Sequence, residues 1–223
     1  MRIFDCTTFY SEHLMMDMRF NILNEFVEKF IVCESTFSHS GKKKKLNFDI
    51  NNYPKFKDKI SYIIIDKEPP NIIGDKNGLA KPFEKRSDSL KRIELSYDYM
   101  IKSLSDVNDD DLIILSDNDE IPNLNSKEFK NSKKDILIFK QLFFYYKFNL
   151  LYDLIPWYGS KAVKKKKLLS MSWLRNLKNK KYPFWRLDTF FNKNKYTNVT
   201  LIDNGGWHFT QIKSSADIFL KLN

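Results

Sequence analysis

Residues 112–122 read Leu112-Ile113-Ile114-Leu115-Ser116-Asp117-Asn118-Asp119-Glu120-Ile121-Pro122, an apolar run followed directly by a cluster of carboxylates. A continuous apolar run of this kind is typical of a strand buried on both faces of a parallel sheet. In an open parallel sheet, ligands bind in the crevice at the carboxyl ends of the strands. The sequence therefore predicts a ligand site at the end of this strand, with the carboxylates beside the ligand.

Strands and helices alternate along the chain around this segment. Short apolar runs predict strands at residues 3–9, 30–34, 60–66 and 136–144. Apolar side chains at helical spacing predict helices over residues 14–26 and 83–104. This alternation predicts an α/β domain with a mainly parallel sheet flanked by helices.

The region of residues 145–198 is rich in aromatic residues and lysine and has weak periodicity. We expect this C-terminal insert to form a hairpin and long loops over one face of the sheet. The chain has no internal repeat and no clear linker, and a length of 223 residues fits one domain. We therefore expect a single domain over residues 1–223.

Asp117 and Asp119 have the spacing of a metal site. Side chains two residues apart at a strand end lie on the same side. Carboxylate, water and phosphate oxygens are the ligands that Mg²⁺ and Mn²⁺ prefer. Without a cation the two carboxylates would repel each other, and a bound cation would relieve that repulsion and hold a diphosphate. The pair therefore predicts a site for Mn²⁺ or Mg²⁺.

An Asp-x-Asp pair has two other interpretations. It is common in solvated turns, although the buried strand before it and the stop at Ile121-Pro122 disfavour a turn here. It also occurs in phosphatases of the haloacid dehalogenase type, in which the first Asp is a nucleophile. That motif usually opens its domain, whereas three predicted strands precede Asp117, and no convincing acidic and lysine partners follow it.

A second segment of interest, Gly205-Gly206-Trp207-His208-Phe209-Thr210, lies near the C-terminus. Paired glycines allow a sharp turn or a close approach to a ligand. His208 is one of three histidines in the chain. A ring nitrogen of His208 is a potential metal ligand, and the alternative is a histidine packed under Trp207.

Together these elements resemble glycosyltransferase family 17. Residues 30–38, FIVCESTFS, with Gly41-Lys42 are similar to the family's FVIVES-TF segment and its following GK. Lys91-Arg92-Ile93 is loosely similar to its QRN helix. Ser116 to Pro122 matches its SDxDEIP almost letter for letter, and Gly206 to Phe209 matches its GWHF element. These similarities run from residue 1 to about residue 210, in the pattern of short microbial members.

The resemblance implies a GT-A-like α/β fold, a UDP-sugar donor (UDP-N-acetylglucosamine in characterised members) and inversion at the anomeric carbon. It implies that Asp119 binds the metal that holds the donor diphosphate. Asp117 then contacts the ribose, or the metal through water, and Glu120 supports the cluster or contacts the donor sugar. His208 completes the metal shell or contacts the diphosphate. The nucleotide-binding part then covers about residues 1–122, and the acceptor-side part about 123–223.

Three further residues are candidates for donor binding. Arg92 precedes the metal-binding strand on a predicted helix and suits a phosphate or the carboxylates of the site, or is an ordinary surface arginine. Glu34 ends the second predicted strand and suits the uridine or ribose, or caps a neighbouring loop. Asp66 ends the third predicted strand and is a weaker candidate for the same contacts.

Inversion requires a general base that deprotonates the acceptor hydroxyl. Asp153, Asp188 and Asp203 are the downstream carboxylates that we consider, and the sequence does not choose among them. The expected acceptor is a glycan or a lipid-linked saccharide. The N-glycan acceptor of the Golgi members is not carried over, because we see neither their transmembrane anchor nor a long extension after GWHF.

The formal net charge of +10 favours anionic partners. Lysine runs at 164–167 and 178–181 predict solvated faces, with contact to an anionic membrane or a lipid-linked acceptor as the alternative. We find no signal peptide, and we expect a cytoplasmic protein, with peripheral contact to the inner face of the membrane as the same alternative.

Two other functions stay open from the sequence. One is a different metal-dependent phosphate enzyme, either a phosphatase or a nucleotidyltransferase. The other is a basic nucleic-acid-binding module, suggested by the charge and the interleaved aromatic residues. Such a module gives no reason for acidic residues at a strand end, and we expect no nucleic-acid partner.

Overall fold

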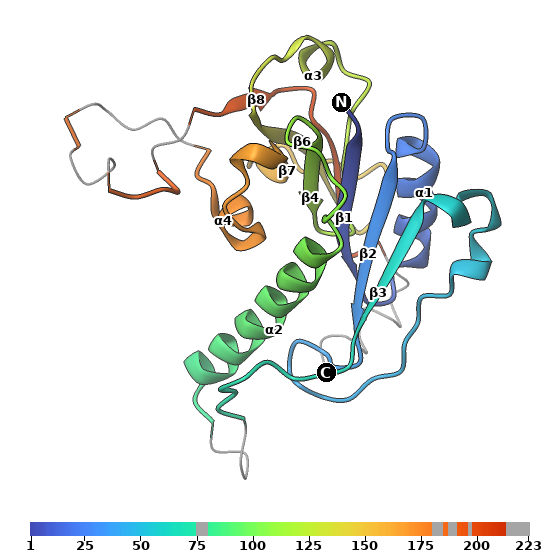
Figure 1. Ribbon diagram of the computed structural model, residues 1–223, viewed down its shortest axis with the longest axis vertical. Coiled ribbons are helices and arrows are strands. Elements are labelled where there is room, and N and C mark those ends of the chain that lie inside the picture. The colour runs from blue at the N-terminus through green and yellow to red at the C-terminus, as the bar shows by residue number, and fades with distance from the viewer. Residues whose placement is uncertain (75–79, 180–184, 187–190, 196–197, 213–223) are drawn as a thin grey trace.

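The computed structural model describes residues 1–74, 80–179, 185–186, 191–195 and 198–212, and its centre is a twisted sheet with helices on both faces (Figure 1). The strand order is β3-β2-β1-β4-β7-β6-β9-β5, with β8 paired to β6. The strands are β1 (Ile3–Phe9), β2 (Lys29–Ser35), β3 (Ile60–Ile65), β4 (Leu112–Ser116), β5 (Glu120–Pro122), β6 (Ile136–Tyr145), β7 (Trp157–Lys164), β8 (Thr200–Ile202) and β9 (Gly206–Thr210). The α-helices are α1 (His13–Leu23), α2 (Pro82–Lys102), α3 (Lys127–Asn131) and α4 (Met171–Asn176), and short 3₁₀ turns lie at η1 (Ile50–Asn52), η2 (Pro54–Lys59) and η4 (Lys165–Lys167).

The N-terminal half of the sheet is parallel. Strand β1 pairs in parallel with β2 and β4, and β2 pairs in parallel with β3. The carboxyl ends of these strands therefore meet at one edge. The prediction of an α/β domain with a mainly parallel sheet flanked by helices is confirmed, and the predicted strands and helices of this half lie within a few residues of the observed ones.

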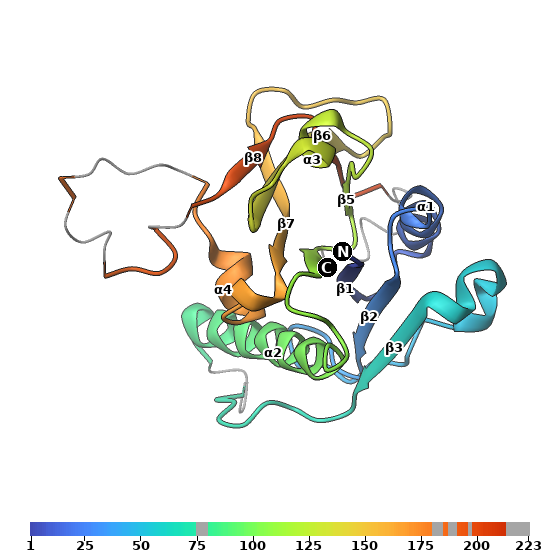
Figure 2. The same cartoon turned by 45° about the horizontal axis from the view of Figure 1, so that its top comes forward.

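Alternation of side chains along the strands divides the core between two faces of the sheet. On one face, Phe20 and Leu23 of α1 pack against Phe30 and Val32 of β2. On the other face, Met100 of α2 and buried residues of α4 pack against the opposite side chains of the same strands. Figure 2 shows α2 and α4 side by side, away from α1. Because α4 packs on α2, the end of α4 reaches the carboxyl edge of the sheet.

The expectation for the C-terminal insert was wrong in one respect. Strand β7 does not lie over a face of the sheet; it pairs antiparallel with both β4 and β6 and so occupies the middle of the sheet. Lys161 and Gly159 interrupt its apolar pattern, which hid the strand in the sequence. Lys161 is nonetheless buried, because its ammonium donates to the carbonyl oxygens at the end of α4, including that of Leu177 at 2.9 Å.

Strand β5 pairs the end of the acidic cluster with the GWHF segment in β9. Glu120 pairs with His208, and Ile121 with Trp207, in an antiparallel ladder between β5 and β9. The residues after β4 therefore form a short strand, which ends at Pro122. Within the described residues, no helix is both long and apolar enough to cross a membrane.

Candidate active site

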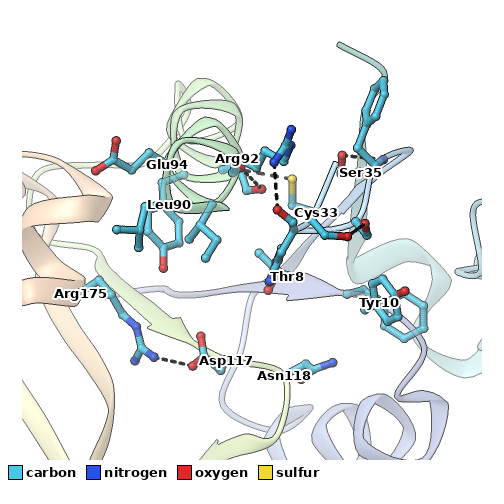
Figure 3. A pocket seen from close by; sticks show the side chains of 18 of the residues that line it. Thr8, Tyr10, Cys33, Ser35, Leu90, Arg92, Glu94, Asp117, Asn118 and Arg175 are labelled. Atoms are coloured by element: carbon cyan, nitrogen blue, oxygen red, sulfur yellow. Dashed lines mark hydrogen bonds and ion pairs between the residues drawn. The ribbon is translucent and has the colours of Figure 1, made fainter. Parts of the chain in front are cut away.

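A cavity of about 690 Å³ opens at the carboxyl ends of β1, β2 and β4. Its walls come from these strand ends, from the loop after β2, from α2, and from the end of α4. Figure 3 shows Thr8 and Tyr10 from the end of β1, Cys33 and Ser35 from β2, and Asp117 after β4, around one space. The carboxyl-edge position predicted from the sequence is thus where the structure has its cavity.

Asp117 and Asp119 both line this cavity, together with Asn118 between them. Asp117 accepts a short ion-paired hydrogen bond from Nη2 of Arg175, which Figure 3 marks with a dashed line. Burial is the main cause that raises the pKa of Asp117; the Arg175 charge opposes it and the Asp119 charge adds to it. The two carboxylates therefore lie close together at the cavity with Arg175 as the neighbouring positive charge, and a bound cation would relieve the repulsion between them.

Glu120 lies behind the two aspartates and is fully buried. Its Oε2 accepts from the backbone N–H of Asp117 at 3.1 Å, and its Oε1 accepts from the indole N–H of Trp157 at 3.0 Å. Burial and the neighbouring Asp117 charge raise the pKa of Glu120 to about 7. Because its two carboxylate oxygens accept hydrogen bonds from Asp117 and Trp157, Glu120 supports the cluster in this structure. It does not line the cavity.

Gly159 makes the close packing behind the site possible. A Cβ at this position would lie 2.1 Å from Oε1 of Gln141 and 2.7 Å from the carboxyl carbon of Glu120. Any other residue would have to displace one of these two buried side chains. The small residue in β7 is therefore required by the position of Glu120.

His208 lies beside Asp119. Its Nε2 is 3.5 Å from Oδ2 of Asp119 and 2.9 Å from the hydroxyl oxygen of Thr210. The imidazole is stacked between Trp157, with ring centroids 4.2 Å apart, and Phe143, at 4.8 Å. Its Nδ1 is buried and has no hydrogen-bond partner among the described residues. The ring is thus packed by aromatic side chains, but these are Trp157 and Phe143 and not Trp207 as the sequence suggested. Its Nε2 still lies beside the acidic cluster.

Asp119 and His208 lie close enough together to share one cation. Adjacent ligands of a six-coordinate Mg²⁺ or Mn²⁺ lie about 3 Å apart, close to the separation of Asp119 Oδ2 from His208 Nε2. Within the described part of the chain, no group of three or more His, Cys, Asp and Glu side chains has the spacing of a complete protein metal site. Such a cation would therefore take its remaining ligands from water and the substrate, as Mg²⁺ in nucleotide sites commonly does.

Arg92 lines the cavity from α2 and is held on both sides. Its Nε and Nη2 donate to Glu68 at 2.8 and 3.2 Å, and its Nη1 donates to the carbonyl of His39 at 3.0 Å. Gly41 lets the loop after β2 come this close, since a Cβ there would lie 2.4 Å from Nη2 of Arg92. Arg92 is thus neither an isolated surface arginine nor a neighbour of the acidic cluster; it fixes the loop that forms one cavity wall.

The structure places Glu34 and Asp66 outside the cavity wall. The buried carboxylate of Glu34 accepts from the backbone N–H groups of Asn47 and Phe48 at 2.9 and 3.0 Å, from the Tyr62 hydroxyl at 2.8 Å, and from Lys44. Glu34 therefore has the loop-capping role that the sequence left as an alternative to donor contact. Asp66 is exposed beyond the end of β3, and its side chain does not reach the cavity.

Two of the three candidate bases, Asp153 and Asp203, are not brought to the cavity. Asp153 is exposed in the loop before β7, and Asp203 is 77% exposed and paired with Lys140 at 3.5 Å. Neither lines the cavity, and Asp188 lies outside the described residues. Among the residues that the structure describes, the cavity-lining carboxylates outside the acidic cluster are Glu12 and Glu94.

Several residues of the site were missed by sequence reasoning. Glu12 accepts a 2.7 Å hydrogen bond from the Asn118 amide and so ties the start of α1 to the acidic cluster. Arg175, from the end of α4, contacts Asp117 and lies 3.7 Å from Glu120. Arg19 donates to the backbone carbonyls of Glu120 at 2.6 Å and Asp117 at 3.4 Å. None of the three lies in a recognisable motif, so the sequence held no local signal for them.

With this geometry in place, comparison with known proteins assigns the class. The model of glycosyltransferase family 17 matches residues 1–176, and the chain belongs to that family. The matched region contains β1 to β7, α4 and the acidic cluster, whereas the GWHF segment lies beyond it.

Two curated relatives are beta-1,4-mannosyl-glycoprotein 4-beta-N-acetylglucosaminyltransferases. The rat and human proteins are each 29% identical to this chain over 125 residues, which is 54% of this chain and 22% of each relative. The chain thus matches only about a fifth of the length of these relatives.

Solved structures resemble the chain more loosely. HddC from Yersinia pseudotuberculosis complexed with GMP-PN aligns over the full length of both chains, with 12% identity and a TM-score of 0.42. The 2-C-methyl-D-erythritol 4-phosphate cytidylyltransferase of Francisella tularensis aligns over 100% of this chain and 99% of its own, with 10% identity and a TM-score of 0.40. Similarity at this level does not bear on function.

Proposed function

We propose that this protein is a metal-dependent glycosyltransferase that moves a sugar from a UDP-sugar to a glycan or lipid-linked acceptor with inversion. The proposed donor is UDP-N-acetylglucosamine, because the curated relatives are N-acetylglucosaminyltransferases. The observation that carries the proposal is the position of Asp117 and Asp119. They follow a buried parallel strand and line the cavity at its carboxyl end, with His208 beside Asp119.

In this proposal, Mn²⁺ or Mg²⁺ is held by Asp119 and His208, with Asp117 as a direct or water-mediated ligand. The cation supplies positive charge where a departing diphosphate gains negative charge. The protein residues do the remaining work. Glu120 orients the backbone of Asp117, the stacked rings of Trp157 and Phe143 hold His208, and Arg92 fixes the loop that closes the cavity.

The candidates for the general base are still Asp153, Asp188 and Asp203. We add Glu12 and Glu94 to these candidates because they line the cavity, and a base must reach the acceptor hydroxyl directly or through one water. Alanine or amide substitution at each of these five positions, measured as kcat with saturating donor, would identify the base by the largest loss.

The decisive experiment compares Asp119→Asn with wild type for release of UDP from UDP-N-acetylglucosamine in Mn²⁺. We expect loss of at least about a hundredfold in kcat, because removing one electrostatic contact to the developing charge commonly has an effect of this size. Asp109→Asn, an exposed acid in the turn before β4, is the matched control and should retain wild-type activity. Full activity of Asp119→Asn would contradict the metal role.

Product analysis and ligand-dependent stability distinguish the transferase from the two other metal-dependent phosphate enzymes. A phosphatase would release inorganic phosphate from simple monoesters, and a nucleotidyltransferase would transfer the nucleotide rather than the sugar. Stabilisation by UDP-sugars that depends on Mn²⁺, measured as a rise in Tm, is expected of the transferase because a ligand that binds the folded state raises its stability. A Tm raised by nucleoside triphosphates but not by UDP-sugars would favour the nucleotidyltransferase.

A further inference from the structure

The guanidinium of Arg175 occupies the space between two carboxylates of the acidic cluster. Its Nη2 pairs with Oδ2 of Asp117, and its Nη1 is 3.7 Å from Oε1 of Glu120. Tyr97 of α2 contacts the same guanidinium, and both residues line the cavity. Figure 3 shows Arg175 reaching from the side of α4 towards Asp117. Without a metal, this cation offsets the negative charge that a metal would otherwise offset.

The backbone of Arg175 is fixed, whereas the side chain that carries its guanidinium is partly exposed to the cavity. Met171 and Leu174 anchor α4 in the core, and the buried ammonium of Lys161 donates to the carbonyl oxygen of Arg175. The Arg175 side chain is 30% exposed, and that of its partner Asp117 is 44% exposed. A guanidinium on a flexible aliphatic stem can therefore change partners at the cavity surface while α4 stays in place.

The other strong cations of the cavity have partners away from the acidic cluster. Among the described residues that line the cavity these cations are Lys44 and Arg92, which pair with Glu34 and Glu68. Arg175 differs because its carboxylate partner is one of the two predicted metal-binding aspartates. A divalent cation at Asp117 would repel the guanidinium and remove its partner, and would release an arginine at the place where the diphosphate binds.

We propose that Arg175 and a divalent cation compete for Asp117, and that the displaced Arg175 binds the diphosphate of the donor. This inference rests on the proposed function, because it takes the donor to be a nucleotide diphosphate sugar. Arginine suits the second partner, since its planar fork donates two parallel hydrogen bonds to phosphate as it does to carboxylate. Arg175 is thus a substrate-binding residue that also protects the empty site from the repulsion between its carboxylates.

The test measures two affinities by isothermal titration calorimetry, that of Mn²⁺ alone and that of UDP in saturating Mn²⁺. We expect Arg175→Gln to bind Mn²⁺ alone at least fivefold more tightly than wild type, because the competing cation is gone. We expect the same variant to bind UDP at least tenfold more weakly, because the phosphate partner is gone. Changes in opposite directions distinguish this role from a structural one, since loosening of the site would weaken both ligands.

Lys178→Gln is the matched control. Lys178 lies three residues after Arg175, is exposed and does not line the cavity, so the loss of its positive charge should leave both affinities unchanged. If Arg175→Gln does not fold, Arg175→Lys retains the charge without the fork; UDP affinity should then fall about threefold or more, with Mn²⁺ affinity unchanged or higher. Equal or weaker Mn²⁺ binding by Arg175→Gln, weaker Mn²⁺ binding by Arg175→Lys, or unchanged UDP binding by either variant overturns the inference. Failure of wild type to bind UDP with Mn²⁺ would instead remove the proposed function.

Discussion

Arg19 donates a 2.6 Å hydrogen bond from Nη1 to the backbone carbonyl of Glu120, across 101 positions of sequence. The other nitrogens of the same guanidinium pair with both carboxylate oxygens of Asp5, at 2.5 and 2.6 Å. Arg19 and Asp5 are completely buried. A buried ion pair of α1 and β1 thus holds the backbone of the acidic cluster at the end of β4.

Loss of Arg19 should destabilise the fold. We expect Arg19→Met to lower the free energy of unfolding by about 3–5 kcal/mol, because it leaves the Asp5 carboxylate buried without its partner. Urea denaturation of the variant measures this cost. The double variant Arg19→Met, Asp5→Leu should recover part of it, since both charges are then removed. A loss below about 1 kcal/mol in the single variant would show that the pair does not hold the cluster.

A methyl group at Gly159 should disturb the acidic cluster without touching the cavity. We expect Gly159→Ala to cost about 1–3 kcal/mol through overpacking, because its Cβ meets Gln141 and Glu120 below 3 Å. Thermal unfolding measures the cost, and UDP binding should weaken with it. Gly74→Ala is the control, since its positive φ of 72° carries backbone strain but no atom lies within 4 Å of the added Cβ. Gly159 is not among the glycines with positive φ, so backbone strain does not contribute there, and a stability of Gly159→Ala unchanged from wild type would contradict overpacking.

Glu34 should behave as a structural residue rather than a donor ligand. We expect Glu34→Ala to lower the free energy of unfolding by about 2–3 kcal/mol, because two backbone N–H groups and a hydroxyl lose their buried acceptor. Asp66→Asn, at an exposed position, should stay within about 0.5 kcal/mol of wild type. An unchanged Tm of Glu34→Ala together with a raised KM for the donor would instead support direct contact.

Lys161 should make stability depend on pH in the alkaline range. Burial, followed by the Arg175 charge, lowers the pKa of Lys161 from 10.5 to about 8. Between these two values the unfolded chain holds a proton that the folded chain has released, so the free energy of unfolding rises with pH there.

Denaturation at several pH values from 7 to 9.5 would test this contribution. The difference between wild type and Lys161→Met should change by up to about 1.4 kcal/mol per pH unit above pH 8. Lys147→Met, at an exposed position after β6, should show no such difference. A wild-type curve parallel to that of Lys161→Met would contradict the lowered pKa.

The strands β1 to β4 and the helices α1 and α2 could be predicted because their patterns are local. Leu112 to Leu115 is continuous and apolar, as burial on both faces requires, and the helices between the strands have apolar residues at helical spacing. Strand β7 escaped prediction for the opposite reason. Its Lys161 is buried through contacts with α4 that no pattern within the strand reveals.

The residues of the candidate site could likewise be predicted only where a local motif marks them. Asp117, Asp119 and His208 stand in sequence motifs, and the structure brings all three together. Glu34, Asp66, Asp153 and Asp203 were chosen for residue type and position along the chain, and the structure places all four away from the cavity wall. A carboxylate at a strand end points into the site or into a neighbouring loop according to what that loop offers, as the backbone N–H groups of Asn47 and Phe48 do for Glu34.

The sequence by itself determined that a carboxylate cluster follows a buried parallel strand, because burial and strand direction are recorded in neighbouring residues. The tertiary structure decided which side chains meet that cluster. Arg19 and Arg175 reach it from opposite sides across 101 and 58 positions of sequence, through two helices that pack on different faces of the sheet. Such contacts depend on the order of the strands and on where each helix docks, and these follow from the packing of the whole core rather than from any local pattern.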